Sequence, residues 1–183
     1  DVHSYIRNRR VGPSNIKSMP VFVDGRLYVT LGGDIWWGKE KAWLQCIDAG
    51  GEGDVTQSGL LWSYPLEGHC CSTPSVHDGL VYVADYSGNL HCVDAVTGRP
   101  YWVHEIGNQI YASTLVADGK VYLGNRRGDF QVLATGKEKR LLSSIRLDAP
   151  VVGTAVAADG MLYVASMTRL FALKAGARGK ATP

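Results

Sequence analysis

The stretch that decides the fold is "GHCCSTPSVHDGLVYVADYSGNLHCVDAVTGRPYW", residues 68–102. Its apolar segments are rich in Val, Tyr and Leu and show no 3.6-residue period, which favours strands over helices. Asp78-Gly79 separates the first two segments, and this dipeptide supplies the positive φ angles that a two-residue hairpin needs. Ser87-Gly88-Asn89 and Thr97-Gly98 mark two further turns. We therefore predict four short antiparallel strands: "STPSVH", "LVYVAD", "LHCVDA" and "RPYWVHEI".

The rest of the chain repeats this unit. Asp-Gly pairs begin at Asp24, Asp78, Asp118 and Asp159, at spacings of 54, 40 and 41 residues. An aliphatic residue and then a tyrosine follow each pair at one fixed offset; the tyrosines are Tyr28, Tyr82, Tyr122 and Tyr163. Four-stranded units of about 40 residues are typical of β-propeller blades. A β-sandwich is the alternative, but it does not require the same tyrosine in every unit. The sequence therefore predicts an all-β propeller of four-stranded antiparallel blades.

The repeat divides the chain into about four blades. We expect them at residues 17–66, 67–107, 108–148 and 149–176, after an N-terminal segment or preceding-blade strand (1–16) and before a C-terminal tail (177–183). The first unit is longer than the second because of two insertions. Eight extra residues fall between its second and third strands ("GGDIWWGKEK"), and six fall between its third and fourth strands ("GGEGDVTQSG").

Composition excludes several classes of function. The formal charge of +2 and the absence of a basic run interleaved with aromatics argue against nucleic acid. No apolar run has the roughly 20 residues of a membrane span. The four cysteines lack a CxxC spacing, the five histidines lack a metal spacing, and no G-x-S-x-G, phosphate-loop or HExxH motif occurs. The sequence therefore assigns no catalytic residue and no metal ligand.

One face of the predicted propeller gathers unusual residues. The turn between the second and third strands of a blade lies on the same face as the crossing to the next blade. Trp36 and Trp37, in the first insertion, therefore emerge with Cys70 and Cys71, in the first crossing. The same insertion contains Asp34 and the same crossing contains His69. Equivalent turns and crossings of the other units add Asp85, Tyr86, Asn108, Gln109, Tyr111, Arg126 and Arg127. Loops on a rigid scaffold commonly carry binding sites, so we predict that this face is a binding surface.

The segment "DAVTGRPYW", residues 94–102, resembles the D-x-x-T-G-x-x-x-W signature of pyrroloquinoline-quinone-like (PQQ-like) propeller repeats. The surrounding pattern resembles the same repeats, over about residues 17 to 176. Quinoprotein alcohol dehydrogenases share this blade, and so does the cofactor-free propeller lipoprotein of the outer-membrane barrel-assembly machinery. The resemblance implies a periplasmic or secreted bacterial protein, a ring of seven or eight blades, and tryptophans (Trp62 and Trp102) that dock one blade on the next.

The chain departs from the signature toward its C-terminus. The third unit lacks the signature's Asp and Trp, and the fourth lacks a fourth strand. With about four blades, the last blade leaves an open edge, which is an aggregation hazard unless another strand covers it. We therefore expect the ring to be completed by remaining blades, if this is the C-terminal half of a larger propeller, or by another chain or a second copy in a homodimer. The segment His3–Asn8 is a candidate for a swapped strand.

The adjacent cysteines allow several interpretations. In quinoprotein dehydrogenases such a pair forms a strained disulfide ring against the quinone, with a tryptophan on the other side. The resemblance therefore makes Trp36, Trp37, Cys70, Cys71 and Arg126 candidates for binding PQQ with Ca²⁺. Those enzymes also need a calcium site and a catalytic aspartate, and neither Asp34 nor Asp85 has matching neighbours. The alternatives are a purely structural disulfide, or one cysteine packed as a small apolar residue and the other partly exposed.

Cys46 and Cys92 share one register in neighbouring blades. Stacked sheets lie roughly 10 Å apart, beyond the roughly 7 Å limit between the Cα atoms of a disulfide. We expect buried free thiols at both positions.

Three functions follow from these observations. The first is a non-catalytic scaffold without a cofactor, which presents its loop face to a protein or a small ligand. The second is a PQQ-dependent dehydrogenase or its cofactor-binding half. The third is a carbohydrate-binding module that uses Trp36 and Trp37.

Overall fold

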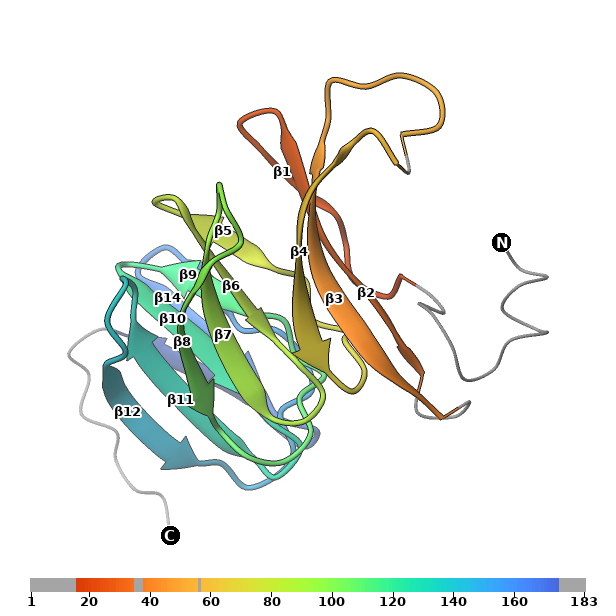
Figure 1. The fold of residues 1–183 in the computed structure, drawn as a ribbon. Helices are drawn as coiled ribbons and strands as arrows, with labels where there is room; N and C mark the ends of the chain where they lie inside the picture. Colours follow the sequence, from red (N-terminus) through yellow and green to blue (C-terminus); the bar gives the residue numbers. More distant parts are fainter. Residues whose placement is uncertain (1–15, 35–37, 56, 175–183) are drawn as a thin grey trace, which may run out of the picture.

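The computed structural model describes residues 16–34, 38–55 and 57–174, which form β-strands and no helix. The strands make four sheets (Figure 1). The first contains β1 (Val21–Val23), β2 (Arg26–Asp34), β3 (Lys39–Asp48) and β4 (Leu60–Glu67), and the second contains β5 (Ser75–His77), β6 (Leu80–Ala84), β7 (Asn89–Asp94) and β8 (Pro100–Glu105). The third contains β9 (Leu115–Ala117), β10 (Lys120–Gly124), β11 (Asp129–Ala134) and β12 (Leu141–Arg146), and the fourth contains β13 (Val156–Ala158), β14 (Met161–Ala165) and β15 (Leu170–Lys174).

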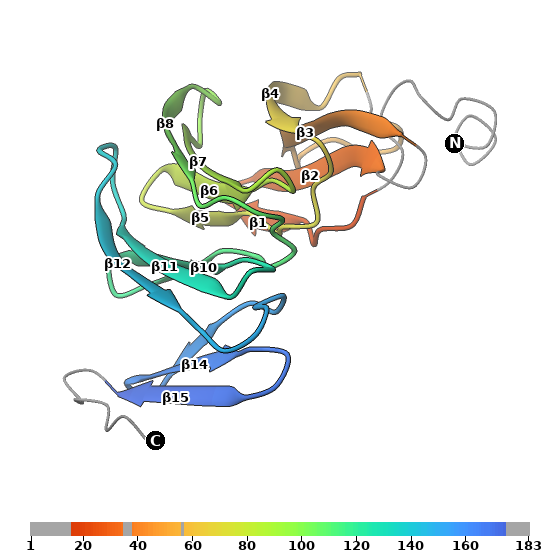
Figure 2. The same cartoon turned by 90° about the horizontal axis from the view of Figure 1, so that it is seen from below.

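Each sheet is a meander whose antiparallel strands lie in chain order. The first strands of the first three sheets lie side by side, since β5 contacts both β1 and β9. Figure 2 shows the sheets fanned out from these inner strands, with β4, β8 and β12 on the outside. This is the blade arrangement of a β-propeller, as the sequence predicted.

The Asp-Gly pairs form the predicted hairpin turns. Asp24, Asp78, Asp118 and Asp159 have φ angles of 49°, 49°, 49° and 50°, and the glycines that follow them have φ between 65° and 75°. Two consecutive positive φ values define the turn whose twist matches the flanking strands. The four tyrosines occupy equivalent ladder positions: Tyr28 pairs with Val21 and Cys46, Tyr82 with Ser75 and Cys92, Tyr122 with Leu115 and Val132, and Tyr163 with Val156 and Ala172.

A tyrosine and a tryptophan dock each of the first two blades on the next. The Tyr28 hydroxyl and the Trp62 indole N–H both donate to the carbonyl oxygen of Ala95, at 3.1 and 3.2 Å. Gly98 lies against Trp62 so closely that a Cβ at this position would come within 2.6 Å of the indole ring. This arrangement explains the Thr-Gly of the signature, since a larger residue would push the tryptophan away.

The second and third blades are joined in the same way. Trp102 donates its indole N–H to the carbonyl oxygen of Gly136 at 2.9 Å, and the Gly136 N–H donates to the Tyr82 hydroxyl at 2.8 Å. The expected docking role of Trp62 and Trp102 is therefore confirmed. In the third blade the equivalent ladder position holds Ser143, which is exposed. Accordingly, the described residues bury four hydrophobic side chains in the cluster between blades three and four, against twelve between blades two and three.

A chain of hydroxyl groups links the crossings just before the inner strands. The N–H of Met19 donates to Thr73 Oγ1 (3.1 Å), the N–H of Thr73 to Ser113 Oγ (2.9 Å), and the N–H of Ser113 to Thr154 Oγ1 (3.1 Å). These four residues each lie five positions before an Asp-Gly pair. The bonds satisfy backbone donors at successive blade boundaries and hold the loop face of each blade against the next.

The first insertion differs from its predicted form. The sequence placed all eight extra residues in a turn, but β2 and β3 contain nine and ten residues, against five and six in β6 and β7. The ladder continues through an irregularity near Gly32 as far as the pair Asp34–Lys39. Extending the hairpin lets these residues pair their backbone groups, which a long loop would not do. The second insertion forms the long loop between β3 and β4 at the opposite end (Figure 1).

The fourth sheet ends the described part of the chain with three strands. β15 pairs with β14, and no described residue pairs with its other edge, where Leu170 is 69% exposed. The segments 1–15 and 175–183, including the candidate strand His3–Asn8, lie outside the described residues. Within the described ranges no helix is long and apolar enough to cross a membrane.

Candidate functional site

The loop face is built from pairs of turns and crossings. The backbone N–H of Tyr86, in the β6–β7 turn, donates to the carbonyl oxygen of His69, in the first crossing, at 2.8 Å. The N–H of Arg126 makes the same bond to Gln109, and that of Met167 to Pro150, each at 2.9 Å. Turns and crossings therefore share one face, as predicted, and each turn is fixed to the crossing beside it.

Four side chains of this face form a continuous row, which we call the aromatic row: His69, Tyr86, Tyr111 and Arg126. The His69 and Tyr86 rings meet edge to face with centroids 5.8 Å apart, and the Tyr86 and Tyr111 rings do so at 5.4 Å. The guanidinium carbon of Arg126 lies 5.6 Å from the centre of the Tyr111 ring, and its Nη1 donates to Gln109 Oε1 at 3.0 Å. Edge-to-face and cation–π contacts of this kind stabilise a defined arrangement.

Cys71 and His69 are in direct contact at one end of the row. Cys71 Sγ lies 3.0 Å from His69 Nε2, and the ammonium nitrogen of Lys17 lies 3.1 Å from the same atom. On the other side of the ring, His69 Nδ1 lies 3.0 Å from the carbonyl oxygen of Gly33. A carbonyl can only accept, so Nδ1 carries the proton and the neutral ring presents an unprotonated Nε2 to the thiol and the ammonium group.

Burial sets the charge of this cluster. Burial lowers the pKa of His69, which is 3% exposed, and the nearby Lys17 charge lowers it further, against the opposing effects of Gly33 and Asp34. Burial also raises the pKa of Cys71, although Lys17 acts in the opposite direction. His69 is therefore a neutral base and Cys71 a thiol at neutral pH.

Cys70 is directed away from Cys71. Its thiol donates to the Ala84 carbonyl oxygen at 3.1 Å, and burial raises its pKa to about 12. Cys70 is buried and Cys71 is partly exposed, which confirms the packing interpretation of the pair. All four cysteines are free, and Cys46 and Cys92 are buried thiols as expected.

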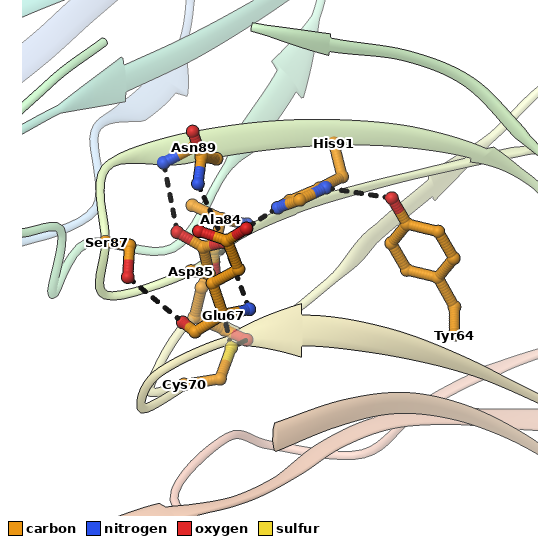
Figure 3. A network of polar contacts seen from close by, with 9 residues as sticks. Tyr64, Glu67, Cys70, Ala84, Asp85, Ser87, Asn89 and His91 are labelled. Atoms are coloured by element: carbon orange, nitrogen blue, oxygen red, sulfur yellow. Dashed lines mark hydrogen bonds and ion pairs between the residues drawn. The ribbon is translucent and has the colours of Figure 1, made fainter. Parts of the chain in front are cut away.

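Asp85 was predicted on the loop surface, but the structure buries it completely (Figure 3). Its carboxylate accepts hydrogen bonds from the Asn89 N–H (3.0 Å), Asn89 Nδ2 (3.2 Å), His91 Nε2 (2.9 Å) and the Glu67 N–H (3.3 Å). His91 Nδ1 in turn lies 3.1 Å from the Tyr64 hydroxyl. Burial alone would raise the pKa of Asp85, but the bonds from His91 and Asn89 hold it below its ordinary value. Asp85 therefore fastens blade one to blade two.

The third blade carries the same pair with the residues exchanged. Asn125 and Asp129 occupy the positions of Asp85 and Asn89, and the Asp129 N–H donates to Asn125 Oδ1 at 2.9 Å. Arg127 and Arg146 donate to the Asp129 carboxylate at 3.0 and 2.6 Å. Arg127, predicted to belong to the binding face, is therefore partly engaged in an internal ion pair.

The structure thus brings together five of the predicted residues: His69, Cys71, Tyr86, Tyr111 and Arg126. It places Asn108 and Gln109 in the same crossing and turns Cys70, Asp34 and Asp85 into the interior. Trp36 and Trp37 lie outside the described residues. Sequence reasoning missed Lys17, Tyr64 and His91. Lys17 could have been found from the repeat. Ser18 and Ser72 each lie six residues before an Asp-Gly pair, so the residues just before them, Lys17 and Cys71, hold equivalent positions in neighbouring blades.

The described residues do not fit the quinone site that the resemblance implies. The two adjacent sulfurs are held by separate partners rather than in a ring. The Asp85 carboxylate is occupied by four internal donors. Among the described residues, no group of three or more His, Cys, Asp or Glu side chains could hold a metal ion.

The repeated blades, the docking tryptophans and the loop face define a protein of the PQQ-like β-propeller class. The family model described as "Outer membrane protein assembly factor BamB" matches residues 16–141, and the chain belongs to this family. The match extends over the first three sheets as far as the start of β12.

Similarity to individual proteins covers limited parts of the chain. It is 40% identical over 69 residues to outer membrane protein assembly factor BamB of Moranella endobia (strain PCIT), covering 38% of this chain and 17% of that protein. It is 35% identical over 102 residues to quinohemoprotein alcohol dehydrogenase of Comamonas testosteroni, covering 46% and 14%. The crystal structure of BamB from Moraxella catarrhalis superimposes with a TM-score of 0.65 at 14% identity, covering 86% and 42%. The chain thus spans less than a fifth of these two curated relatives.

Proposed function

We propose that this chain is a non-catalytic protein-interaction scaffold, and that the aromatic row is where a partner binds. The observation that carries the proposal is the interlocked set of Tyr86 and Arg126, on turns, and Tyr111, on a crossing, where backbone hydrogen bonds fix turns to crossings. Tyrosine and arginine are enriched among the residues that dominate binding energy at protein interfaces. Because these side chains are already ordered, they lose less conformational entropy when a partner binds.

The charges of the loop face favour an acidic partner segment. Asp85 and Asp129 have internal partners, the former fully buried and the latter paired with two arginines. Arg126 and Lys17 are exposed. Arg126 contacts Gln109 and Tyr111, Lys17 contacts His69, and all three of these groups are neutral. A carboxylate from a partner would find an arginine donor beside two aromatic rings.

The relatives suggest a setting for this binding. Two of them are outer membrane protein assembly factors, from Moranella endobia and Nitrosomonas eutropha. We infer that this chain works outside the cytoplasm, in a bacterial protein that contacts proteins of outer-membrane assembly. In this proposal other blades, from the same polypeptide, another chain or a second copy, complete the ring.

The proposed partner site predicts the effect of two substitutions. Tyr111→Ala and Arg126→Ala should each weaken binding by about tenfold or more, because each removes one anchor of the row. The measurement is binding to tiled 15-residue peptides from outer-membrane β-barrel proteins and from the periplasmic segments of their assembly machinery. Arg99→Ala, an exposed arginine in the β7–β8 turn at the opposite end of the blade, is the matched control. Equal binding by all three variants would contradict the proposal.

A second prediction concerns the cofactor. We propose that the scaffold works without PQQ, which the separated sulfurs of Cys70 and Cys71 and the internal bonding of Asp85 support. Purified protein incubated with PQQ and Ca²⁺ and then desalted should show no quinone absorbance, while a quinoprotein dehydrogenase treated in parallel retains it. A retained chromophore that is lost in a Cys70→Ser, Cys71→Ser double variant would instead favour the dehydrogenase hypothesis. The carbohydrate hypothesis, which depends on Trp36 and Trp37, stays a prediction.

A further inference from the structure

We propose that Cys71 is a nucleophilic thiol that exchanges with disulfides arriving at the loop face, and that His69 accepts its proton. The exchange needs three elements, which the structure holds within one cluster: an accessible sulfur, an adjacent base held by a group that orients it, and a positive charge near the sulfur. Nothing in the scaffold role requires this chemistry, so it is a separate activity of the same face.

The first element is an accessible sulfur. Cys71 is partly exposed, whereas Cys46, Cys70 and Cys92 are buried. Burial raises the pKa of both Cys70 and Cys92 to about 12, so these two thiols are inert on grounds of both access and charge. The chain therefore carries its own unreactive reference thiols.

The second element is the base and the group that orients it. His69 Nε2 lies 3.0 Å from Cys71 Sγ, within reach for direct proton transfer. The Gly33 carbonyl oxygen, at 3.0 Å, fixes the proton of the neutral ring on Nδ1, and the Nε2 lone pair is left to the thiol and the Lys17 ammonium group, which share it. Gly33 is held at this distance because any side chain there would collide with the backbone of residues 68 and 69, where a Cβ would come within 2.3 Å.

The third element is charge around the sulfur. The Lys17 ammonium group, 3.1 Å from Nε2, lies beside the thiol and favours its thiolate form electrostatically. The other groups that face His69 are the Asp34 carboxylate and the Tyr86 ring. At rest the cluster is a thiol with a neutral imidazole, so the proton must move at the moment of reaction, and His69 is placed to take it.

The exchange step balances without any further reagent. The Cys71 thiol proton passes to His69 Nε2 as the sulfur attacks one sulfur of a disulfide R–S–S–R′. A bond forms between Cys71 Sγ and that sulfur, and the S–S bond of the disulfide breaks. The leaving R′S⁻ then takes the proton from His69 and departs as a thiol, so Cys71 is oxidised and R′S is reduced.

The proposal is tested by the rate at which the native protein reacts with two disulfide probes. These are 5,5′-dithiobis(2-nitrobenzoate), which is anionic, and 2,2′-dithiodipyridine, which is neutral. We expect one fast thiol in the native protein and four in guanidinium chloride. Cys71→Ser should abolish the fast reaction. At neutral pH the wild-type Cys71 thiol should react faster than the thiol of glutathione. Burial raises the pKa of Cys71, so without a base to take its proton this thiol would react more slowly than glutathione.

Two variants separate the roles of the base and the cation. His69→Gln keeps a hydrogen-bonding group but cannot take the proton, and it should slow both probes by about tenfold or more. Lys17→Met should slow the anionic probe more than the neutral one. His69 is buried, so a urea unfolding curve must first show that the His69→Gln protein is folded. The comparison of the wild-type protein with glutathione tests the reactivity of Cys71 even if this variant does not fold. A native thiol slower than glutathione toward both probes would overturn the proposal, as would an unchanged rate in a folded His69→Gln protein. Peptide binding does not enter these measurements, so the scaffold proposal can fail separately.

Discussion

Replacing Trp102 by alanine should lower the free energy of unfolding by about 3–5 kcal/mol, the usual cost of removing a large aromatic side chain from a core. Trp102 is 8% exposed, packs against Tyr82 with ring centroids 6.0 Å apart, and donates to Gly136 of the next blade. The substitution removes one of the main contacts between blade two and blade three, and the bonds from Gly136 to Tyr82 and from Thr73 to Ser113 remain. Because each blade is stabilised by its neighbours, the loss should also reduce the cooperativity of unfolding.

Urea unfolding followed by far-ultraviolet circular dichroism measures both effects. Trp102→Phe should cost less than the alanine variant, since it keeps a ring but loses the hydrogen bond. Ser143→Ala is the matched control, because Ser143 holds the equivalent position of blade three, where it is exposed and docks nothing. It should change the free energy of unfolding by no more than about 0.5 kcal/mol. An alanine variant of Trp102 with an unchanged midpoint and slope would contradict the docking role.

Much of this architecture could be predicted because turns and ladders have strong local signals. Asp-Gly at one offset from a tyrosine fixed the hairpin, the second strand and its register at Tyr28, Tyr82, Tyr122 and Tyr163 together. The first insertion was located correctly but given the wrong form. Whether extra residues make a loop or extend a hairpin depends on whether their backbones can pair, and the pair Asp34–Lys39 shows that they do. Composition alone does not reveal that.

The candidate site was predictable as a surface but not as chemistry. Blade topology placed His69, Cys71, Tyr86, Tyr111 and Arg126 on one face, because crossings and turns are fixed by chain direction. Which way each side chain turns depends on packing between blades, and there the prediction for Asp85 was wrong. A signal for its burial was present in the sequence: the third blade repeats the pair as Asn125 and Asp129, so the positions suit an internal hydrogen bond rather than an exposed ligand.

That internal pair underlies the second large effect. Asp85→Ala should lower the free energy of unfolding by about 3–5 kcal/mol at neutral pH, because each buried donor left without its acceptor costs about 1–3 kcal/mol. It would leave His91 Nε2 and the backbone N–H groups of Glu67 and Asn89 without their acceptor, inside the contact between blades one and two. The matched comparison is His91→Gln, which copies Gln131 at the same position of blade three, where it accepts from His104 at 2.7 Å. Because a glutamine can still donate to Asp85, this variant should cost less than half as much.

The pH dependence distinguishes a charged Asp85 from a merely well-packed one. The pKa of Asp85 in the folded protein is lower than in the unfolded chain. The charged carboxylate therefore contributes fully to the free energy of unfolding above about pH 5, and this contribution is lost as the pH falls below about 4 and through the folded-state pKa. Wild-type stability should therefore fall between pH 5 and 3 more steeply than that of Asp85→Ala, which has already lost this contribution. Asp94 and Asp129, whose pKa values are also lowered, contribute equally to both proteins and cancel in the comparison. Parallel curves over this range, measured by urea unfolding at each pH, would show that the carboxylate charge does not fasten the two blades.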